Sequence, residues 1–152
     1  MKILVFSDSH RSLSGMYDAI DRHQPQQVIH LGDLMGDAET VSEHYPQIPF
    51  CLVPGNCDGW VISTPVKKQI TLAGKSILLS HGHRWGVKSG YDAAIADARA
   101  VGADILLFGH THVPLCQQLE DGLWMMNPGP ARSSCGLIEI ENNAVSCTMH
   151  PL

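Results

Sequence analysis

The segment Ile3-Leu4-Val5-Phe6-Ser7-Asp8-Ser9-His10 sets a pattern that later parts of the chain repeat. Its four apolar residues form a continuous run, which is typical of a strand that is covered on both faces. The run gives way at once to Asp8 and His10. We therefore expect a buried strand over residues 3–6 with polar side chains at its carboxyl end.

Helical segments separate this strand from two further apolar runs. Residues 13–23 carry apolar side chains at helical spacing and stop before Pro25, and residues 38–45 form a shorter helical segment. The apolar runs themselves cover residues 27–31 and 50–53. Strands that alternate with helices favour a mostly parallel sheet with right-handed crossovers. The first sixty residues therefore predict the order βαβαβ.

The pattern changes after Trp60. Residues 67–79 alternate around a tight turn and predict an antiparallel hairpin, and a helix is expected over residues 89–101. A buried strand follows at residues 105–108, and two more hairpins are indicated by turn residues at 121–122 and 141–143. The sequence shows no repeat and no linker. We expect one α/β domain over residues 1–152, built on two sheets.

Composition and charge narrow the possible partners. The 152 residues carry a net charge of −5 and no block of Lys or Arg, which argues against a long nucleic acid as partner. No apolar run approaches the about 20 residues of a membrane span, so no membrane partner is expected. Five cysteines without a CxxC pair indicate free thiols and a cytoplasmic location. The oligomeric state is left open by the sequence.

Nitrogen and oxygen donors follow five of the expected strands. One such motif alone is compatible with a solvated loop, but five in the same register point to a common site, because ligands bind at the carboxyl ends of strands in α/β sheets. His30 lies inside an apolar run instead and is expected to be a hydrogen-bonded core histidine. The donors are Asp8 and His10, Asp33, Asn56, His81 with His83, and His110 with His112.

This donor set fits a pair of metal ions better than a single one. Two carboxylates, one amide and four or five imidazoles exceed what one ion needs, whereas two ions that share a carboxylate would use them all. Two cations ~3.5–4 Å apart are the arrangement that holds a phosphate group and lowers the pKa of water from ~15.7 toward ~7. Oxygen and imidazole donors without thiolate suit Mn²⁺, and also Fe, Co, Ni or Zn.

The same motifs carry a resemblance to a known family. The chain resembles the calcineurin-like metallophosphoesterase superfamily, and most of all its small bacterial and archaeal YfcE-like phosphodiesterase branch, over residues 1–130. The motifs are Asp8-Ser9-His10, Gly32-Asp33, Gly55-Asn56-Cys57-Asp58, His81-Gly82-His83 and Gly109-His110-Thr111-His112.

The resemblance implies both a fold and a ligand set. The implied fold is a two-sheet β-sandwich flanked by helices, in four layers of the αββα type. The implied site is dinuclear, with a metal-bridging hydroxide as the nucleophile. Seven residues carry over as ligands: Asp8, His10 and His112 for the first metal, Asp33 as the bridge, and Asn56, His81 and His110 for the second metal.

One motif departs from the wider superfamily. Many members have a His in the Gly-Asn-His-Asp motif that assists the leaving group, and this chain has Cys57 there. A thiol is a poor proton donor to an alkoxide, so departure of the leaving group rests on the quality of that group, on the metals or on another acid. His83 is the nearest candidate for such an acid. Asp58 is expected to orient Asn56 without itself binding a metal. Arg11 is a candidate for contact with a phosphate oxygen.

These features predict a metal-dependent phosphodiesterase that acts on a small phosphodiester. A non-catalytic, metal-binding scaffold for protein interactions is the alternative, because relatives with this fold have that role after losing ligands. A nuclease acting on polymers would need a basic groove, and the net charge of −5 argues against it. Substrate specificity is expected to lie in residues 60–66, 84–90 and 127–135.

Overall fold

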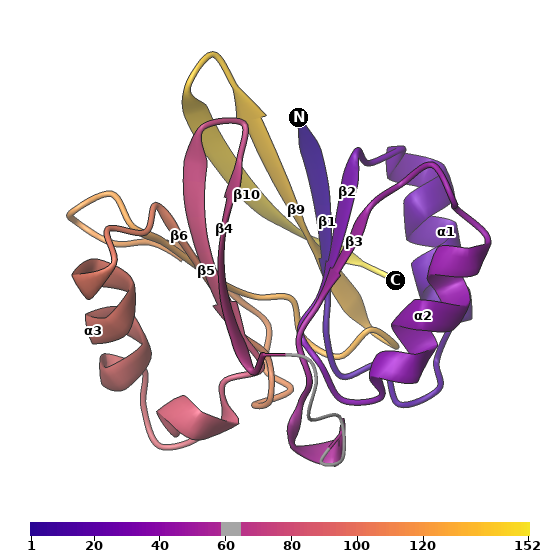
Figure 1. Ribbon diagram of the computed structural model, residues 1–152, viewed down its shortest axis with the longest axis horizontal. Coiled ribbons are helices and arrows are strands. Elements are labelled where there is room, and N and C mark those ends of the chain that lie inside the picture. Colours follow the sequence, from indigo (N-terminus) through magenta and orange to yellow (C-terminus); the bar gives the residue numbers. More distant parts are fainter. Residues whose placement is uncertain (59–64) are drawn as a thin grey trace.

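The computed structural model describes residues 1–58 and 65–152, so part of the expected specificity segment 60–66 lies outside the described residues. Two five-stranded sheets face each other (Figure 1). Helices α1 (Ser14–His23) and α2 (Met35–Glu43) cover the first sheet, and α3 (Asp92–Ala100) covers the second. The predicted two-sheet sandwich flanked by helices is confirmed. No helix among the described residues is long and apolar enough to cross a membrane.

The first sheet has the strand order β10-β9-β1-β2-β3. Its β1, β2 and β3 are parallel, with Val5 opposite Ile29 and Ile29 opposite Cys51, while β9 and β10 form an antiparallel hairpin beside β1. The predicted βαβαβ order is therefore present in one half of the molecule. The strands are β1 (Lys2–Phe6), β2 (Gln27–His30), β3 (Phe50–Leu52), β9 (Ser134–Glu141) and β10 (Ala144–Pro151).

The second sheet has the order β4-β5-β6-β8-β7. Its centre is parallel, because β5 pairs with β6 and β6 with β8, and an antiparallel strand flanks each side. The parallel strands of both sheets end at the same lower edge of the molecule (Figure 1). The strands are β4 (Lys67–Leu72), β5 (Lys75–Ser80), β6 (Ile105–Leu107), β7 (Leu115–Gln118) and β8 (Trp124–Asn127).

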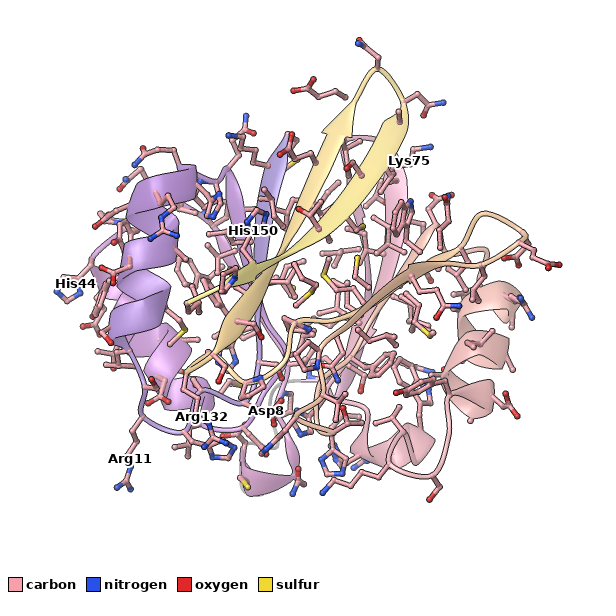
Figure 2. The ribbon with its side chains drawn as sticks, turned by 180° about the vertical axis from the view of Figure 1, so that it is seen from behind. Asp8, Arg11, His44, Lys75, Arg132 and His150 are labelled. Carbon is pink, nitrogen blue, oxygen red and sulfur yellow. The ribbon has the colours of Figure 1, made fainter. Side chains whose placement is uncertain are left out.

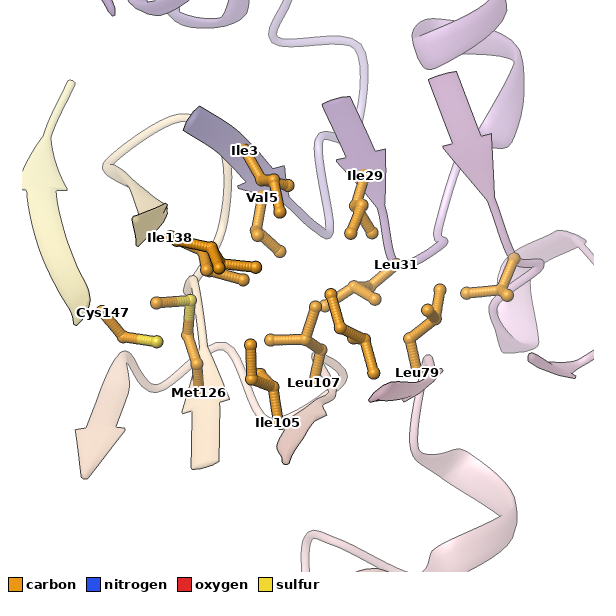
Figure 3. Close-up of a cluster of buried hydrophobic side chains, with 13 residues drawn as sticks. Ile3, Val5, Ile29, Leu31, Leu79, Ile105, Leu107, Met126, Ile138 and Cys147 are labelled. Atoms are coloured by element: carbon orange, nitrogen blue, oxygen red, sulfur yellow. The ribbon is translucent and has the colours of Figure 1, made fainter. Parts of the chain in front are cut away.

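The main core lies between the two sheets (Figure 3). Ile3 and Val5 of β1 point into it, while Leu4 and Phe6 point the other way, toward α1 and α2. This period of two explains the continuous apolar run at the start of the chain, because both faces of β1 are buried. The core thereby holds the carboxyl ends of the two sheets next to each other.

Helix α2 begins earlier than its sequence indicates. We predicted a start at residue 38, but the helix begins at Met35, directly after Leu34 with a φ of 60°. The backbone N–H of Met35 donates to the carboxylate of Asp58 at 3.0 Å. A distant side chain therefore satisfies one of the free N–H groups of the first turn, and a local pattern does not reveal this.

Candidate metal centre

The predicted ligands lie on loops that follow β1, β2, β3, β5 and β6. Figure 2 shows Asp8 at the lower edge of the molecule, where the loops from the two halves meet. Three of the side chains are deeply buried, since Asp8 is 1% exposed, Asp33 3% and His81 0%. Burying two carboxylates is costly unless positive charge or hydrogen bonds compensate. The contacts of each carboxylate therefore show what compensates for its burial.

Asp8 holds one carboxylate oxygen in protein contacts and presents the other to imidazoles. Its Oδ2 accepts hydrogen bonds from the Ser7 hydroxyl at 2.6 Å and from the His110 backbone N–H at 3.1 Å. Its Oδ1 lies 3.1 Å from His112 Nε2 and 3.7 Å from His81 Nε2. The side chain is thus fixed, with one oxygen facing a group of nitrogen donors.

Asp33 is arranged in the same way. Its Oδ1 accepts a hydrogen bond from the Cys57 backbone N–H at 2.9 Å. Its Oδ2 lies 3.5 Å from His81 Nε2 and 3.9 Å from His10 Nε2. Burial raises the pKa of Asp33, but the Cys57 hydrogen bond and the attraction of His81 outweigh it, so the pKa lies below its usual value. The carboxylate form is therefore favoured.

His81 lies between the two carboxylates in an orientation that suits a ligand. Its Nδ1 donates to the Leu31 backbone carbonyl at 2.7 Å. Its Nε2 is then the atom that faces Asp8 and Asp33, and it lies 3.1 Å from His110 Nδ1. Hydrogen bonds of this kind, on the nitrogen that does not bind the metal, orient histidine ligands. Burial, with the neighbouring His81, lowers the pKa of His110, which favours its neutral form.

Four ligand atoms come close enough to surround one cation. One atom each from Asp8, His10, Asp33 and His112 lies within 4.8 Å of the other three. The resemblance assigns these residues to the first metal and the bridge. His81 and His110 adjoin Asp33 and belong to the set assigned to the second metal. Among the described residues, no Lys or Arg forms an ion pair with either carboxylate. Converging oxygen and nitrogen lone pairs of this kind fit divalent cations.

The backbone at the site is strained. Positive φ is uncommon for residues other than glycine, and such outliers cluster at functional sites. Two glycines also allow close approach, because a Cβ at Gly55 would collide with the Asp33 carboxylate and one at Gly109 with Ser7 and Asp8. Five of the seven predicted ligands have positive φ: Asp8, His10, Asp33, His110 and His112.

Two buried residues, Asp58 and Asn127, fix the loops that carry the predicted ligands by hydrogen bonds. Asp58 accepts the backbone N–H groups of Asp33 at 3.0 Å, Gly55 at 2.9 Å and Met35 at 3.0 Å. The hydrogen bonds of Asp58 go to the backbone of the segments that carry Asp33 and Asn56, and its role in orienting Asn56 stays a prediction. Asp58 therefore positions both loops of the first sheet.

Asn127 has the equivalent role in the second sheet. Its Nδ2 donates to the Gly109 carbonyl at 3.1 Å and to Thr111 Oγ1 at 2.9 Å. The sequence places Asn127 only in the expected specificity segment 127–135 and does not predict this contact. The one available signal was an amide side chain at the end of an apolar strand, which is the pattern that marked the other site residues.

A third buried group supports the loop after β1. His30 Nδ1 accepts the Gly32 backbone N–H at 3.1 Å, and its Nε2 lies 3.0 Å from Ser9 Oγ. Ser9 Oγ in turn donates to Asp37 Oδ2 at 2.8 Å. The expectation that His30 is a hydrogen-bonded core histidine is confirmed.

The remaining predicted site residues take different positions. The His83 ring centroid lies 5.6 Å from that of His81 and 6.2 Å from that of His110, and its Nδ1 is buried without a partner among the described residues. Asn56 opens the one-turn helix Asn56–Asp58, and its amide contacts Cys57 Sγ at 3.9 Å. Arg11 extends outward, away from Asp8 (Figure 2). The catalytic and ligand roles of these residues stay predictions.

Comparison with known proteins agrees with this geometry. A family model described as the calcineurin-like phosphoesterase superfamily domain matches residues 1–143. A Bacillus subtilis protein named probable metallophosphoesterase YsnB is 31% identical, with 96% of this chain and 88% of the relative covered.

Solved structures show the same likeness. A conserved Streptococcus pneumoniae protein described as a predicted phosphoesterase has a TM-score of 0.79 and 25% identity, covering 99% of this chain and 88% of that one. Vps29 from Entamoeba histolytica, solved with Zn²⁺, has a TM-score of 0.75 and 25% identity, with 99% of each chain covered. The chain belongs to the calcineurin-like phosphoesterase superfamily.

Proposed function

We propose that the protein is a metal-dependent phosphodiesterase in which residues 1–152 act as one domain. The observation that supports this most is the pair of buried carboxylates, Asp8 and Asp33, each with one oxygen fixed by protein donors and the other facing imidazole nitrogens. The seven residues named by the resemblance would hold two divalent ions, Mn²⁺ being the first candidate. All five cysteines are free, which suits the reducing cytoplasm.

When bound, the metals would neutralise phosphate oxygens and lower the pKa of a water molecule so that it attacks phosphorus at neutral pH. The chain keeps Asp33 ionised and His81 oriented for this purpose. Cys57 is not suited to act as the nucleophile, because burial and the charge of Asp33 raise the pKa of its thiol. His83 faces His81 and His110 and is the proposed proton donor to the leaving group.

A diester is the preferred substrate class. A phosphomonoester carries two negative charges, and its recognition favours additional cationic side chains. Among the described residues, neither Asp8 nor Asp33 has an Arg or Lys paired with it, so little extra positive charge is built into the site.

The test begins by removing metals with a chelator and restoring Mn²⁺. Hydrolysis of a chromogenic phosphodiester and of the matching monoester is then followed for the wild type, for Asp33→Asn and for Asp121→Asn, which changes an exposed surface carboxylate. Mn²⁺ should restore diester hydrolysis in the wild type and in Asp121→Asn but not in Asp33→Asn. Faster hydrolysis of the monoester would overturn the preference for diesters.

A non-catalytic scaffold for protein interactions is the second candidate. It is favoured by the structural likeness to Vps29 and by Val113, which is 58% exposed directly beside His112. Metal binding without turnover of either ester would select this candidate.

A further inference from the structure

A cavity adjoins the candidate metal centre on the side of the first sheet. It has a volume of about 400 Å³ and lies between the loop after β1, the start of α2 and the helix Asn56–Asp58. Cys57 forms part of its wall and also donates its backbone N–H to Asp33. The cavity is therefore linked through Cys57 to Asp33, which is a predicted ligand.

The lining combines two apolar residues with two charged residues whose charged groups have no partner among the described residues. Leu34 and Met35 are the apolar residues, and Arg11 and Glu39 are the charged ones. Arg11 uses its backbone N–H to bind Asp37, and Glu39 uses its carbonyl to accept from Ser42. Among the described residues, the Arg11 guanidinium and the Glu39 carboxylate form no hydrogen bond or ion pair.

The other carboxylates around the cavity are already engaged. Asp58 accepts three backbone N–H groups, and Asp37 Oδ2 accepts from Ser9 Oγ and the Arg11 N–H. A ligand in the cavity would thus meet one donor group and one acceptor group over an apolar surface. Arg guanidinium groups stack on planar rings and donate to ring acceptors, while a carboxylate accepts N–H or O–H groups.

We propose that this cavity binds the organic arm of the phosphodiester, and that the arm is a nucleoside. A nucleoside offers a planar base for the Leu34, Met35 and Arg11 surface and donor groups for Glu39. The volume falls within the range of small-molecule sites, about 300–1,000 Å³. A second phosphate on the arm is disfavoured, because it would approach Glu39. This inference rests on the proposed phosphodiesterase function and names the substrate class of the same site.

Gly36 gives a direct way to close the cavity. It lines the cavity, and a Cβ added there meets no atom within 4 Å. Gly36 lies in the first turn of α2, and leucine has a higher helix propensity than glycine. Gly36→Leu should therefore fill the cavity and keep the fold. Thr40→Leu, on an exposed position one turn further along α2, is the matched control; it removes the hydrogen bond of the Thr40 hydroxyl to the Gly36 carbonyl but adds no side chain at position 36.

Binding of adenosine to the metal-free protein separates this inference from catalysis. Adenosine should shift the backbone amide NMR signals of residues 34–39 in the wild type and in Thr40→Leu, and its affinity should fall about tenfold or more in Gly36→Leu. With Mn²⁺ restored, the KM of a nucleoside p-nitrophenyl phosphodiester should rise more in Gly36→Leu than that of methyl p-nitrophenyl phosphate.

The outcomes distinguish the two proposals. Absence of amide shifts at residues 34–39, or equal adenosine affinity in the wild type and Gly36→Leu, would overturn the nucleoside cavity even if diesters are hydrolysed. Equal KM changes for the two diesters would also overturn it. Adenosine binding that Gly36→Leu abolishes, without hydrolysis of any diester, would uphold the cavity as a nucleoside site and reject the phosphodiesterase.

Discussion

The two sheets contribute different donors to the same site. Loops of the first sheet supply the buried carboxylates Asp8 and Asp33, whereas loops of the second supply the imidazoles of His81, His110 and His112. Among the described residues, one contact between a carboxylate and an imidazole lies within the first sheet, between His10 and Asp33 at 3.9 Å, and the others cross from one sheet to the other. Neither sheet alone carries the set, so the apolar core between the sheets is what creates the metal centre. Metal binding should then be linked to folding.

The largest expected effect is the loss of Mn²⁺ affinity when a metal ligand of either sheet is replaced. Replacing a residue that hydrogen-bonds to a metal ligand typically lowers metal affinity by about 10- to 100-fold. Asp8→Asn and His81→Asn replace ligands themselves, so each should lower Mn²⁺ affinity by more than this. Asn tolerates the φ of 52° at position 8, so the loop should keep its shape. Titration calorimetry measures the affinity, with Asp18→Asn on the surface of α1 as control. Normal affinity in either variant would mean that one sheet suffices.

The next effect concerns the residue that positions the loops of the first sheet. Asp58→Asn should lower the free energy of unfolding by about 3 kcal/mol, because three buried backbone N–H groups lose a charged acceptor. Urea denaturation of the metal-free protein measures it. A loss no greater than that of Asp18→Asn would show that the loops hold their shape without Asp58.

The corresponding residue of the second sheet should have a smaller effect, and mainly on binding. Asn127→Leu removes the hydrogen bonds to Gly109 and Thr111 and should weaken Mn²⁺ binding by about 10- to 100-fold. Gln117→Leu, an exposed change on β7, is the control. Unchanged Mn²⁺ affinity would indicate that the His110 loop is fixed by other contacts.

The smallest effect is a pH dependence that belongs to the first sheet. Burial lowers the pKa of His30 to about 4, so the folded protein keeps it neutral while the unfolded chain binds a proton below pH 6.5. With respect to His30, the free energy of unfolding has its full value above pH 6.5. It decreases as the pH falls from 6.5 toward 4, by at most about 1.4 kcal/mol per pH unit. Stability curves between pH 5 and 7 should flatten in His30→Gln. An identical slope in both proteins would contradict this role.

Much of the fold followed from local pattern, and so did the placement of the site. The apolar runs at residues 3–6 and 105–108 predicted strands, and the donors at their carboxyl ends predicted where the site lies. The early start of α2, the backbone contacts of Asp58 and those of Asn127 were not predictable. Each depends on a hydrogen bond between segments far apart in the sequence, which residue spacing does not encode.

The positive φ angles at five predicted ligands also restrict which amino acids can replace them in the course of evolution. The five are Asp8, His10, Asp33, His110 and His112. Asn, Asp and Gly tolerate such angles, while β-branched and bulky residues do not. A lineage released from selection for metal binding would therefore still be confined by its backbone at these five positions. Asparagine or glycine there would be the expected trace of a lost metal site, and the loops could persist as a rigid surface long after the chemistry had gone.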